Sequence, residues 1–190
     1  MRPRVYLAGP DVFFPEPEVW AERKKAICAR HGLAGVSPLD EWPDEPVAWA
    51  AFPLWRKIAA RNEAHIRSCQ GLIANLTPFR GPSADAGTIF EVGFARALGL
   101  KLFGYTTVRT LFLARTLAFL GDRATAGLDG AWVDGDGLLV EDFGLLDNLM
   151  IEGGIEGAGG TVTMGDVPGW TDLSVFEYCV ANAARQLVGG

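Results

Sequence analysis

Two carboxylates, Asp85 and Glu91, stand in the part of this 190-residue chain that is best suited to chemistry. They belong to residues 75–99, NLTPFRGPSADAGTIFEVGFARALG, where a loop with glycine and proline leads into an apolar pattern of helical spacing. Helical side chains lean toward the N-terminus, so we expect Glu91 to lie over Gly87, which has no side chain to cover it. We expect Asp85 either to cap the helix or to stand free in the loop. Two carboxyl groups that meet beside unpaired backbone N–H groups can hold a substrate and transfer a proton.

The same spacing also fits a purely structural interpretation. Acidic residues are common in the first turns of helices, where they interact favourably with the helix dipole. On that interpretation Glu91 is a solvated side chain and Asp85 is only an N-cap. The residue types and their spacing leave both interpretations open.

Short apolar strands that alternate with helices must position these carboxylates. We expect strands at residues 4–8, 33–36, 71–76 and 101–105, and helices at residues 16–31, 52–69 and 89–99. This alternation predicts an α/β fold, a doubly wound and mostly parallel sheet with helices on both faces. In such sheets ligands bind in a crevice beyond the carboxyl ends of the strands, and the loop before Asp85 follows one of these ends.

The rest of the chain differs in its proline and glycine content. Residues 37–50 are too rich in proline for a regular element. Thirteen of the 24 glycines lie between Gly121 and Gly169, which favours short elements there. We expect a short helix at 147–156 and an amphipathic closing helix at 171–187. The length suits one domain over residues 1–190, with a core at about 4–105 and a glycine-rich part, 106–190, that completes the sheet, the site and the subunit contacts.

Composition excludes several classes of partner. The net charge of −6 and the pI near 4.9 argue against a nucleic-acid polymer as a partner. The longest apolar stretch, Leu111–Leu120, contains Arg115 and is too short to span a membrane, and the N-terminus does not resemble a secretory signal. We therefore expect a soluble, cytoplasmic protein. The cysteines lack metal-ligand spacing and are expected to be buried, reduced thiols: Cys28, Cys69 and Cys179.

Several motifs together resemble the nucleoside 2-deoxyribosyltransferases. These are YLAGPDVFFP near the start, Asn62 four residues before Ile66, the segment IANLTPFRGPSADAGTIFEVGFARALG, and VEDFGLLDNLMI. The resemblance spans about residues 5–151. It implies a flavodoxin-like or Rossmann-like fold in an obligate homo-oligomer. It also implies exchange of the base on a 2′-deoxyribonucleoside for a free nucleobase, with no metal and no organic cofactor.

The resemblance also implies catalytic roles. Glu91 matches the family's nucleophile, which attacks the anomeric carbon and holds the deoxyribosyl group as an ester until a second base arrives. Asp85 matches an acidic residue that contacts the base and can pass it a proton. Tyr6 matches a tyrosine that hydrogen-bonds the nucleophilic carboxylate, although an ordinary strand aromatic would look the same. Gly87, below Glu91, is included among the substrate-binding positions.

Further positions match substrate contacts. Asn148 and Met150 match residues that the family supplies from a neighbouring subunit, Asn148 to the 5′-hydroxyl, so the site would exist only in the oligomer. Asn62 stands where some members carry an aspartate; asparagine can hydrogen-bond the base or the sugar but cannot deliver a proton. Phe13, directly after the first strand, is placed either to stack on the base or to pack.

Two other functions remain open. If water rather than a base meets the ester, the same residues make a nucleoside or nucleotide N-glycosidase. A nucleotide hydrolase would need phosphate donors, and Arg56, Lys57 and Arg61 are candidates although their spacing is typical of solvated side chains. A non-catalytic nucleotide-sensing module could use the same crevice, but it gains nothing evident from a carboxylate beside the sugar.

Overall fold

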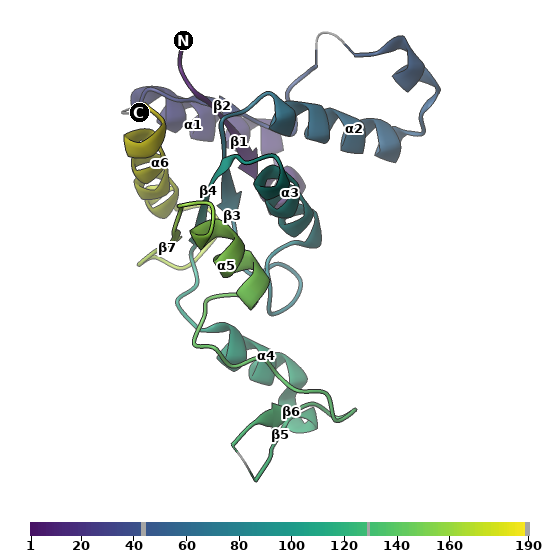
Figure 1. The fold of residues 1–190 in the computed structure, drawn as a ribbon, viewed down its shortest axis with the longest axis vertical. Coiled ribbons are helices and arrows are strands. Elements are labelled where there is room, and N and C mark those ends of the chain that lie inside the picture. Colours follow the sequence, from purple (N-terminus) through teal and green to yellow (C-terminus); the bar gives the residue numbers. More distant parts are fainter. Residues whose placement is uncertain (43–44, 129, 189–190) are drawn as a thin grey trace.

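A parallel sheet with helices on both faces forms the centre of the molecule (Figure 1). The computed structural model describes residues 1–42, 45–128 and 130–188. Within them the main sheet has five strands: β1 (Arg4–Ala8), β2 (Ala34–Val36), β3 (Gly71–Asn75), β4 (Lys101–Thr106) and β7 (Val162–Met164). The helices are α1 (Pro17–Arg30), α2 (Leu54–Arg67), α3 (Ala86–Ala97), α4 (Phe112–Leu120), α5 (Leu149–Glu156) and α6 (Ser174–Leu187). Shorter elements are the 3-10 helices η1 (Pro10–Phe13), η2 (Val47–Ala51) and η3 (Gly121–Arg123) and the hairpin strands β5 (Thr125–Ala126) and β6 (Trp132–Val133).

The strand order of the main sheet, β2-β1-β3-β4-β7, contains a switch point of the kind at which such sheets bind ligands. All neighbouring strands are parallel, and Tyr6 in β1 is in register with Val36 in β2 and Leu72 in β3. The chain winds to one side from β1 to β2 and to the other from β3 to β4. The carboxyl ends of β1 and β3 therefore flank the switch point of a flavodoxin-like sheet, where ligands bind.

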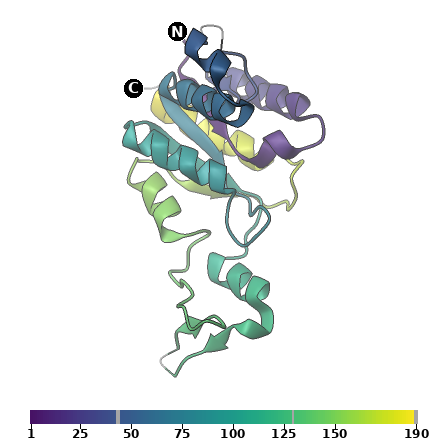
Figure 2. The same ribbon diagram turned by 90° about the vertical axis from the view of Figure 1, so that its right-hand side faces the viewer.

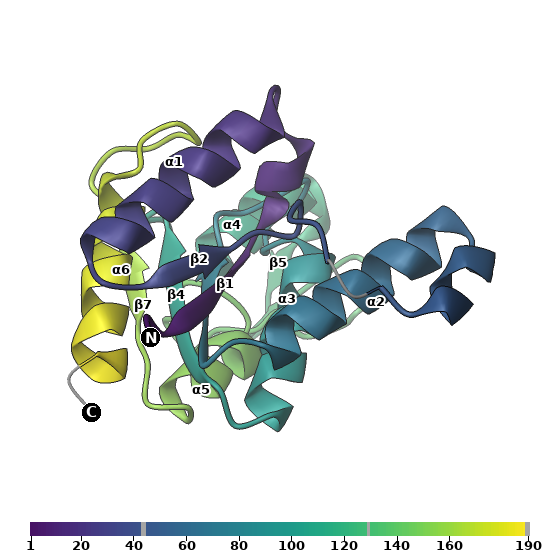
Figure 3. The same cartoon turned by 90° about the horizontal axis from the view of Figure 1, so that it is seen from above.

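Alternating strand residues divide the core into two layers. Tyr6, Leu72 and Leu102 pack in one buried cluster with residues of α2, α3 and α5. Their neighbours Val5 and Ile73 point the other way and pack with residues of α1 and α6. Figure 3, seen from above, shows these two groups of helices on opposite faces of the sheet. The predicted doubly wound fold is confirmed, and the sheet is wholly parallel.

Most expected elements are present with ends shifted by up to three residues, and β1 has the expected bounds. Among the α-helices and the strands of the main sheet, two elements were not expected. Strand β7 has only three residues, too few for an alternating pattern, and α4 buries none of its residues. In the region expected to be irregular, residues 47–50 belong to η2, and residues 43 and 44 lie outside the described part of the chain. As predicted, the three cysteines are buried free thiols.

Helix α4 and the hairpin β5–β6 extend away from the sheet (Figure 2). Large apolar side chains on this projecting arm face solvent: Phe119 is 61% exposed and Leu139 is 77% exposed. In the part of the chain that the structure describes, no helix has both the length and the apolar character needed to cross a membrane.

Candidate active site

Helix α3 begins at the carboxyl-end edge of the sheet with Asp85 as its N-cap. Oδ2 of Asp85 accepts hydrogen bonds from the backbone N–H of Thr88 (3.0 Å) and from its hydroxyl (3.2 Å). A Cβ on Gly87 would lie 3.0 Å from this same oxygen, so a larger residue there would crowd the cap. Of the two positions expected for Asp85, the structure shows the capping one. The cap fixes where α3 starts and thereby places Glu91 in its second turn.

Glu91 is joined to two other elements through one carboxylate oxygen. The hydroxyl of Tyr6 in β1 donates a hydrogen bond to Oε1 over 2.7 Å, and Nδ2 of Asn62 in α2 donates a weaker one over 3.3 Å. Tyr6 is fully buried and is therefore a rigid partner. The structure does not show Glu91 as a freely solvated side chain. Three segments distant in the sequence meet at its carboxylate.

The surroundings of Glu91 disfavour its charge. Burial raises the pKa of Glu91 to about 7, and the nearby charge of Asp85 acts in the same direction. The hydrogen bonds from Tyr6 and Asn62 oppose this because they stabilise the carboxylate. Burial and the negative charge of Glu91 also raise the pKa of Tyr6 well above its usual value, so its hydroxyl stays a donor. Glu91 is thus a carboxylate whose charge can be neutralised readily near neutral pH.

Two polar atoms at this site remain for a ligand. Oδ1 of Asn62 is buried and has no hydrogen-bond partner among the described residues. The capping bonds of Asp85 both go to Oδ2, which leaves its Oδ1 without a capping bond in that part of the chain. Buried polar groups are rarely left unpaired, so a substrate with donor groups would complete this site.

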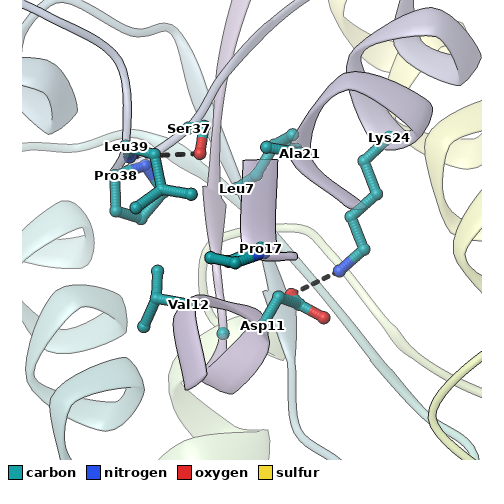
Figure 4. A pocket seen from close by; sticks show the side chains of 10 residues that line it. Leu7, Asp11, Val12, Pro17, Ala21, Lys24, Ser37, Pro38 and Leu39 are labelled. Atoms are coloured by element: carbon teal, nitrogen blue, oxygen red, sulfur yellow. Dashed lines mark hydrogen bonds and ion pairs between the residues drawn. The ribbon is translucent and has the colours of Figure 1, made fainter. Parts of the chain in front are cut away.

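A buried ion pair holds the loop after β1. Lys24, only 4% exposed, pairs with Asp11 in η1 (Figure 4) and donates a hydrogen bond of 2.7 Å to the hydroxyl of Tyr105. Burial lowers the pKa of Lys24, whereas Asp11 raises it. A Cβ on Gly9 would lie 2.7 Å from Cβ of Asn75, so only glycine lets this loop close over β3. These contacts fix η1 and with it the position of Phe13.

Phe13 itself lines a different cleft. It is 57% exposed, and its ring stacks on that of Phe79 with the centroids 5.4 Å apart. The cleft that these rings line includes neither Glu91 nor Asp85 among its lining residues. Phe13 therefore lines a cleft that Asp85 and Glu91 do not share.

Asn148 and Met150 lie at the start of α5, beyond α3. Oδ1 of Asn148 caps α5 by accepting a bond from the N–H of Met150 (3.0 Å), and its Nδ2 donates to Glu141 (2.6 Å). Both residues line a groove of about 670 Å³ between α3 and α5, together with Ile89 and Val92 of α3. Within the described chain, no hydrogen bond joins Asn148 to Glu91. The structure therefore does not bring Asn148 and Met150 into the site at Glu91 of the same chain.

A buried carboxylate, Asp147, connects the two regions. Its oxygens accept bonds from the hydroxyl of Ser83 (2.5 Å), the N–H of Ala84 (2.9 Å) and the N–H of Asn148 (2.8 Å). Asp147 is 2% exposed, and a guanidinium nitrogen of Arg115 lies 3.8 Å away. The loop that ends at Asp85 is thus fixed to the N-terminus of α5.

The structure brings together Tyr6, Asn62, Asp85 and Glu91, and their roles in catalysis stay predictions. Two of the candidate phosphate donors, Lys57 and Arg61, are paired with Glu45. The sequence interpretation missed other residues. Lys24 could have been found because it interrupts an apolar helix face with Ile27 and Cys28, but no local pattern marks Asp147. Among the described residues, no group of three or more acidic, histidine or cysteine side chains is placed to hold a metal ion.

Comparison with known proteins gives relatives over nearly the whole chain. The model of a family described as nucleoside 2-deoxyribosyltransferase matches residues 5–150. An uncharacterized protein from Schizosaccharomyces pombe is 36% identical over 199 aligned residues, which cover 97% of this chain and 90% of that protein.

Solved structures agree with this match. A 2-deoxyribosyltransferase from Leishmania mexicana is 30% identical, with a TM-score of 0.61 over 94% of this chain and 97% of that one. A conserved protein from Enterococcus faecalis, 20% identical with a TM-score of 0.54, covers 98% of this chain and 99% of its own, and shares the fold.

Proposed function

Because this chain belongs to the nucleoside 2-deoxyribosyltransferase family, we propose that it moves the 2-deoxyribosyl group of a 2′-deoxyribonucleoside from one nucleobase to another. The observation that carries the proposal is the carboxylate of Glu91. It is partly buried and held by Tyr6 and Asn62 at the switch point of the sheet. A carboxylate held this way is suited to attack on an anomeric carbon.

The reaction has two displacements. An oxygen of Glu91 attacks C1′ of the sugar as the bond from C1′ to the base nitrogen breaks, and the base leaves with the electron pair of that bond. Asp85 supplies the proton that the departing base takes up. A second base then attacks C1′ of the ester through a ring nitrogen, returns the proton of that nitrogen to Asp85 and releases the carboxylate of Glu91, so that two inversions give net retention.

Tyr6 and Asn62 have different roles at the carboxylate of Glu91. Both donate to Oε1, so the other oxygen, Oε2, is the one that attacks the sugar. The buried Tyr6 hydroxyl also stabilises the charged form, which is the nucleophile. The free Oδ1 of Asn62 accepts a hydrogen bond from the base or the sugar.

Asn148 and Met150 complete the site of a second copy of the chain. In support, Met150 is 73% exposed and lines an open groove on the side of α3 away from the Tyr6 contact. A single chain would then hold the nucleophile but lack its sugar contacts. The protein would be active only as a homo-oligomer.

Incubation with deoxyinosine, with and without adenine, tests the reaction by chromatography. Deoxyadenosine formed only in the presence of adenine supports transfer. Equal release of hypoxanthine with and without adenine means that the chain is an N-glycosidase. If Glu91→Ala binds deoxyinosine like the wild type and the wild type converts no deoxynucleoside, the chain is a sensing module instead.

Co-expression of two inactive variants tests the shared site. Glu91→Ala and Asn148→Ala are each expected to be inactive alone. In mixed oligomers one wild-type Glu91 meets one wild-type Asn148, so about a quarter of wild-type activity should return for random pairing in a symmetric dimer. A co-expressed sample as inactive as the single variants would show that Asn148 does not act in trans.

A further inference from the structure

Aromatic side chains from three distant segments gather around one cleft. They come from η1 and the start of α1, from the loop after β3, and from the loop before α6: Phe13, Phe14, Trp20, Phe79 and Trp170. The cleft measures about 680 Å³, within the range of small-molecule sites. Arg80 and Glu16 also line it.

The rings form a continuous series of contacts. Phe13 and Phe79 stack with their planes 14° apart, and Trp170 lies edge-on to Phe79 at 6.2 Å between centroids. Trp170 also contacts Phe14 at 5.3 Å, and Phe14 lies edge-on to Trp20 at 6.1 Å. Such mutual contacts hold each ring in one orientation. A wall of fixed rings favours a rigid, planar ligand.

Charge narrows the class of ligand further. The guanidinium of Arg80 lies 5.2 Å and 4.6 Å from the ring centroids of Phe13 and Phe79, and that of Arg23 lies 4.9 Å from the ring of Trp20. The chain's own cations therefore occupy these cation–π positions and would repel a cationic ligand. The carboxylate of Glu16 would repel a polyphosphate. A neutral planar ring is left, and it can stack on aromatic or guanidinium planes.

The backbone also marks this cleft. In the described part of the chain, two residues other than glycine have positive φ: Glu16 at 52° and Arg80 at 56°. Both line the cleft. Left-handed backbone at such residues costs free energy and is found preferentially where a site requires it.

We propose that this aromatic cleft binds a free nucleobase, as a second site separate from the one at Glu91. The choice of a nucleobase rests on the proposed function. Phe79 and Arg80 precede Asp85 in one loop, and Phe13 follows the strand that carries Tyr6. The cleft would thus hold an acceptor base on the same protein that forms the deoxyribosyl ester.

Titration with adenine tests the cleft in the full-length protein. Equilibrium dialysis, with tryptophan fluorescence alongside, would follow the wild type and five variants: Glu91→Gln, Trp170→Leu, Trp170→Phe, Phe14→Leu and Trp55→Leu. We expect Trp170→Leu and Phe14→Leu to raise the Kd of adenine by about tenfold, the loss that one stacking ring produces. Glu91→Gln should still bind adenine, and Trp170→Phe should retain most of the affinity. Trp55, 71% exposed on α2, is the control and should leave the Kd unchanged.

Binding of only one adenine per chain, or a second adenine that binds unchanged in both Trp170→Leu and Phe14→Leu or is lost in Glu91→Gln, would overturn the proposal. The chromatographic assay of the wild type keeps the two hypotheses apart. Exchange without binding in the cleft would leave the proposed function intact and reject the second site. Binding in the cleft without any exchange would support the second site and reject the proposed function. Circular dichroism of each variant verifies that it is folded.

Discussion

The carboxylate of Glu91 sits where its charge is costly. Burial raises its pKa to about 7 from 4.5, so the folded chain holds the proton more tightly than the unfolded chain. Stability is therefore fully present below about pH 4.5 and falls as the pH rises toward 7, because the unfolded state releases its proton first. The group that we propose as nucleophile weakens the fold at the pH at which it is charged.

Glu91→Gln should accordingly stabilise the protein at alkaline pH and abolish exchange. Glutamine keeps an oxygen that can accept the Tyr6 hydrogen bond but carries no charge. We expect a gain of about 1–3 kcal/mol in the free energy of unfolding at pH 8 and almost none at pH 4, from urea denaturation. The exposed Glu156→Gln is the matched control. Equal stability of Glu91→Gln and wild type at pH 8 would contradict the burial argument.

Tyr6→Phe should move the acid limb of the pH–activity profile. The Tyr6 hydroxyl lowers the pKa of Glu91, so its removal raises that pKa and extends the inactive, protonated range upward. We expect a shift of about one pH unit in kcat/KM measured from pH 5 to pH 9, together with a lower kcat. Tyr178→Phe, at a side chain 62% exposed on α6, serves as control. An unshifted limb would mean that Tyr6 does not set the charge of Glu91.

At the scale of elements, Asp147 connects the loop before α3 with the beginning of α5. Its carboxylate accepts hydrogen bonds from Ser83, Ala84 and Asn148, and its removal would leave these buried or half-buried donors without that partner. We expect Asp147→Ala to lower the free energy of unfolding by about 2–4 kcal/mol in denaturant titrations. The exposed Asp142→Ala should change it by less than about 0.5 kcal/mol. If both substitutions had equally small effects, Asp147 would not stabilise the connection between the loop before α3 and the beginning of α5.

The strands and helices of the core could be predicted because each has a buried face. Strand β1 shows this most clearly, since its four buried residues, 5–8, form a single apolar run. Helix α4 was not predicted in the same way, because none of its residues is fully buried and no core contact marks its apolar pattern. Strand β7 adds only a three-residue edge to β4.

Less of the candidate site than of the fold could be predicted from the sequence. Motif resemblance indicated Glu91, Asp85 and Tyr6, but the contact between Tyr6 and Glu91 joins residues 85 positions apart and follows from no local rule. The helix pattern marks Lys24, but its pairing with Asp11 and the contacts of Asp147 depend on tertiary packing alone. For the same reason the aromatic cleft, built from three separate segments, has no signature in the sequence.

At the scale of the whole molecule, the chain exposes apolar surface that a second copy would cover. None of the residues of α4, in the projecting arm, is fully buried. The groove between α3 and α5 is lined by apolar side chains that include Ile89 and Met150. Isolated apolar patches of this kind mark contact surfaces. This supports the proposed homo-oligomer.

The melting temperature should therefore depend on protein concentration. Association stabilises the folded chain by mass action, so we expect Tm to rise by several degrees between about 1 and 100 µM, measured by circular dichroism. Phe119→Asp, at a side chain 61% exposed in α4, should weaken this dependence and lower the oligomer fraction in sedimentation. A Tm that is the same at every concentration would argue for a monomer.

The adjacency of Asp147 and Asn148 has a genetic consequence. In the proposed oligomer, Asp147 supports the loop before α3 in its own subunit, whereas Asn148 contributes to the site of the neighbouring subunit. A substitution at this joint therefore damages catalytic centres in two chains at once. When a variant gene and a normal gene are expressed equally, random pairing in a dimer leaves about a quarter of the sites with both an intact loop and an intact Asn148, below the half that gene dose alone would leave.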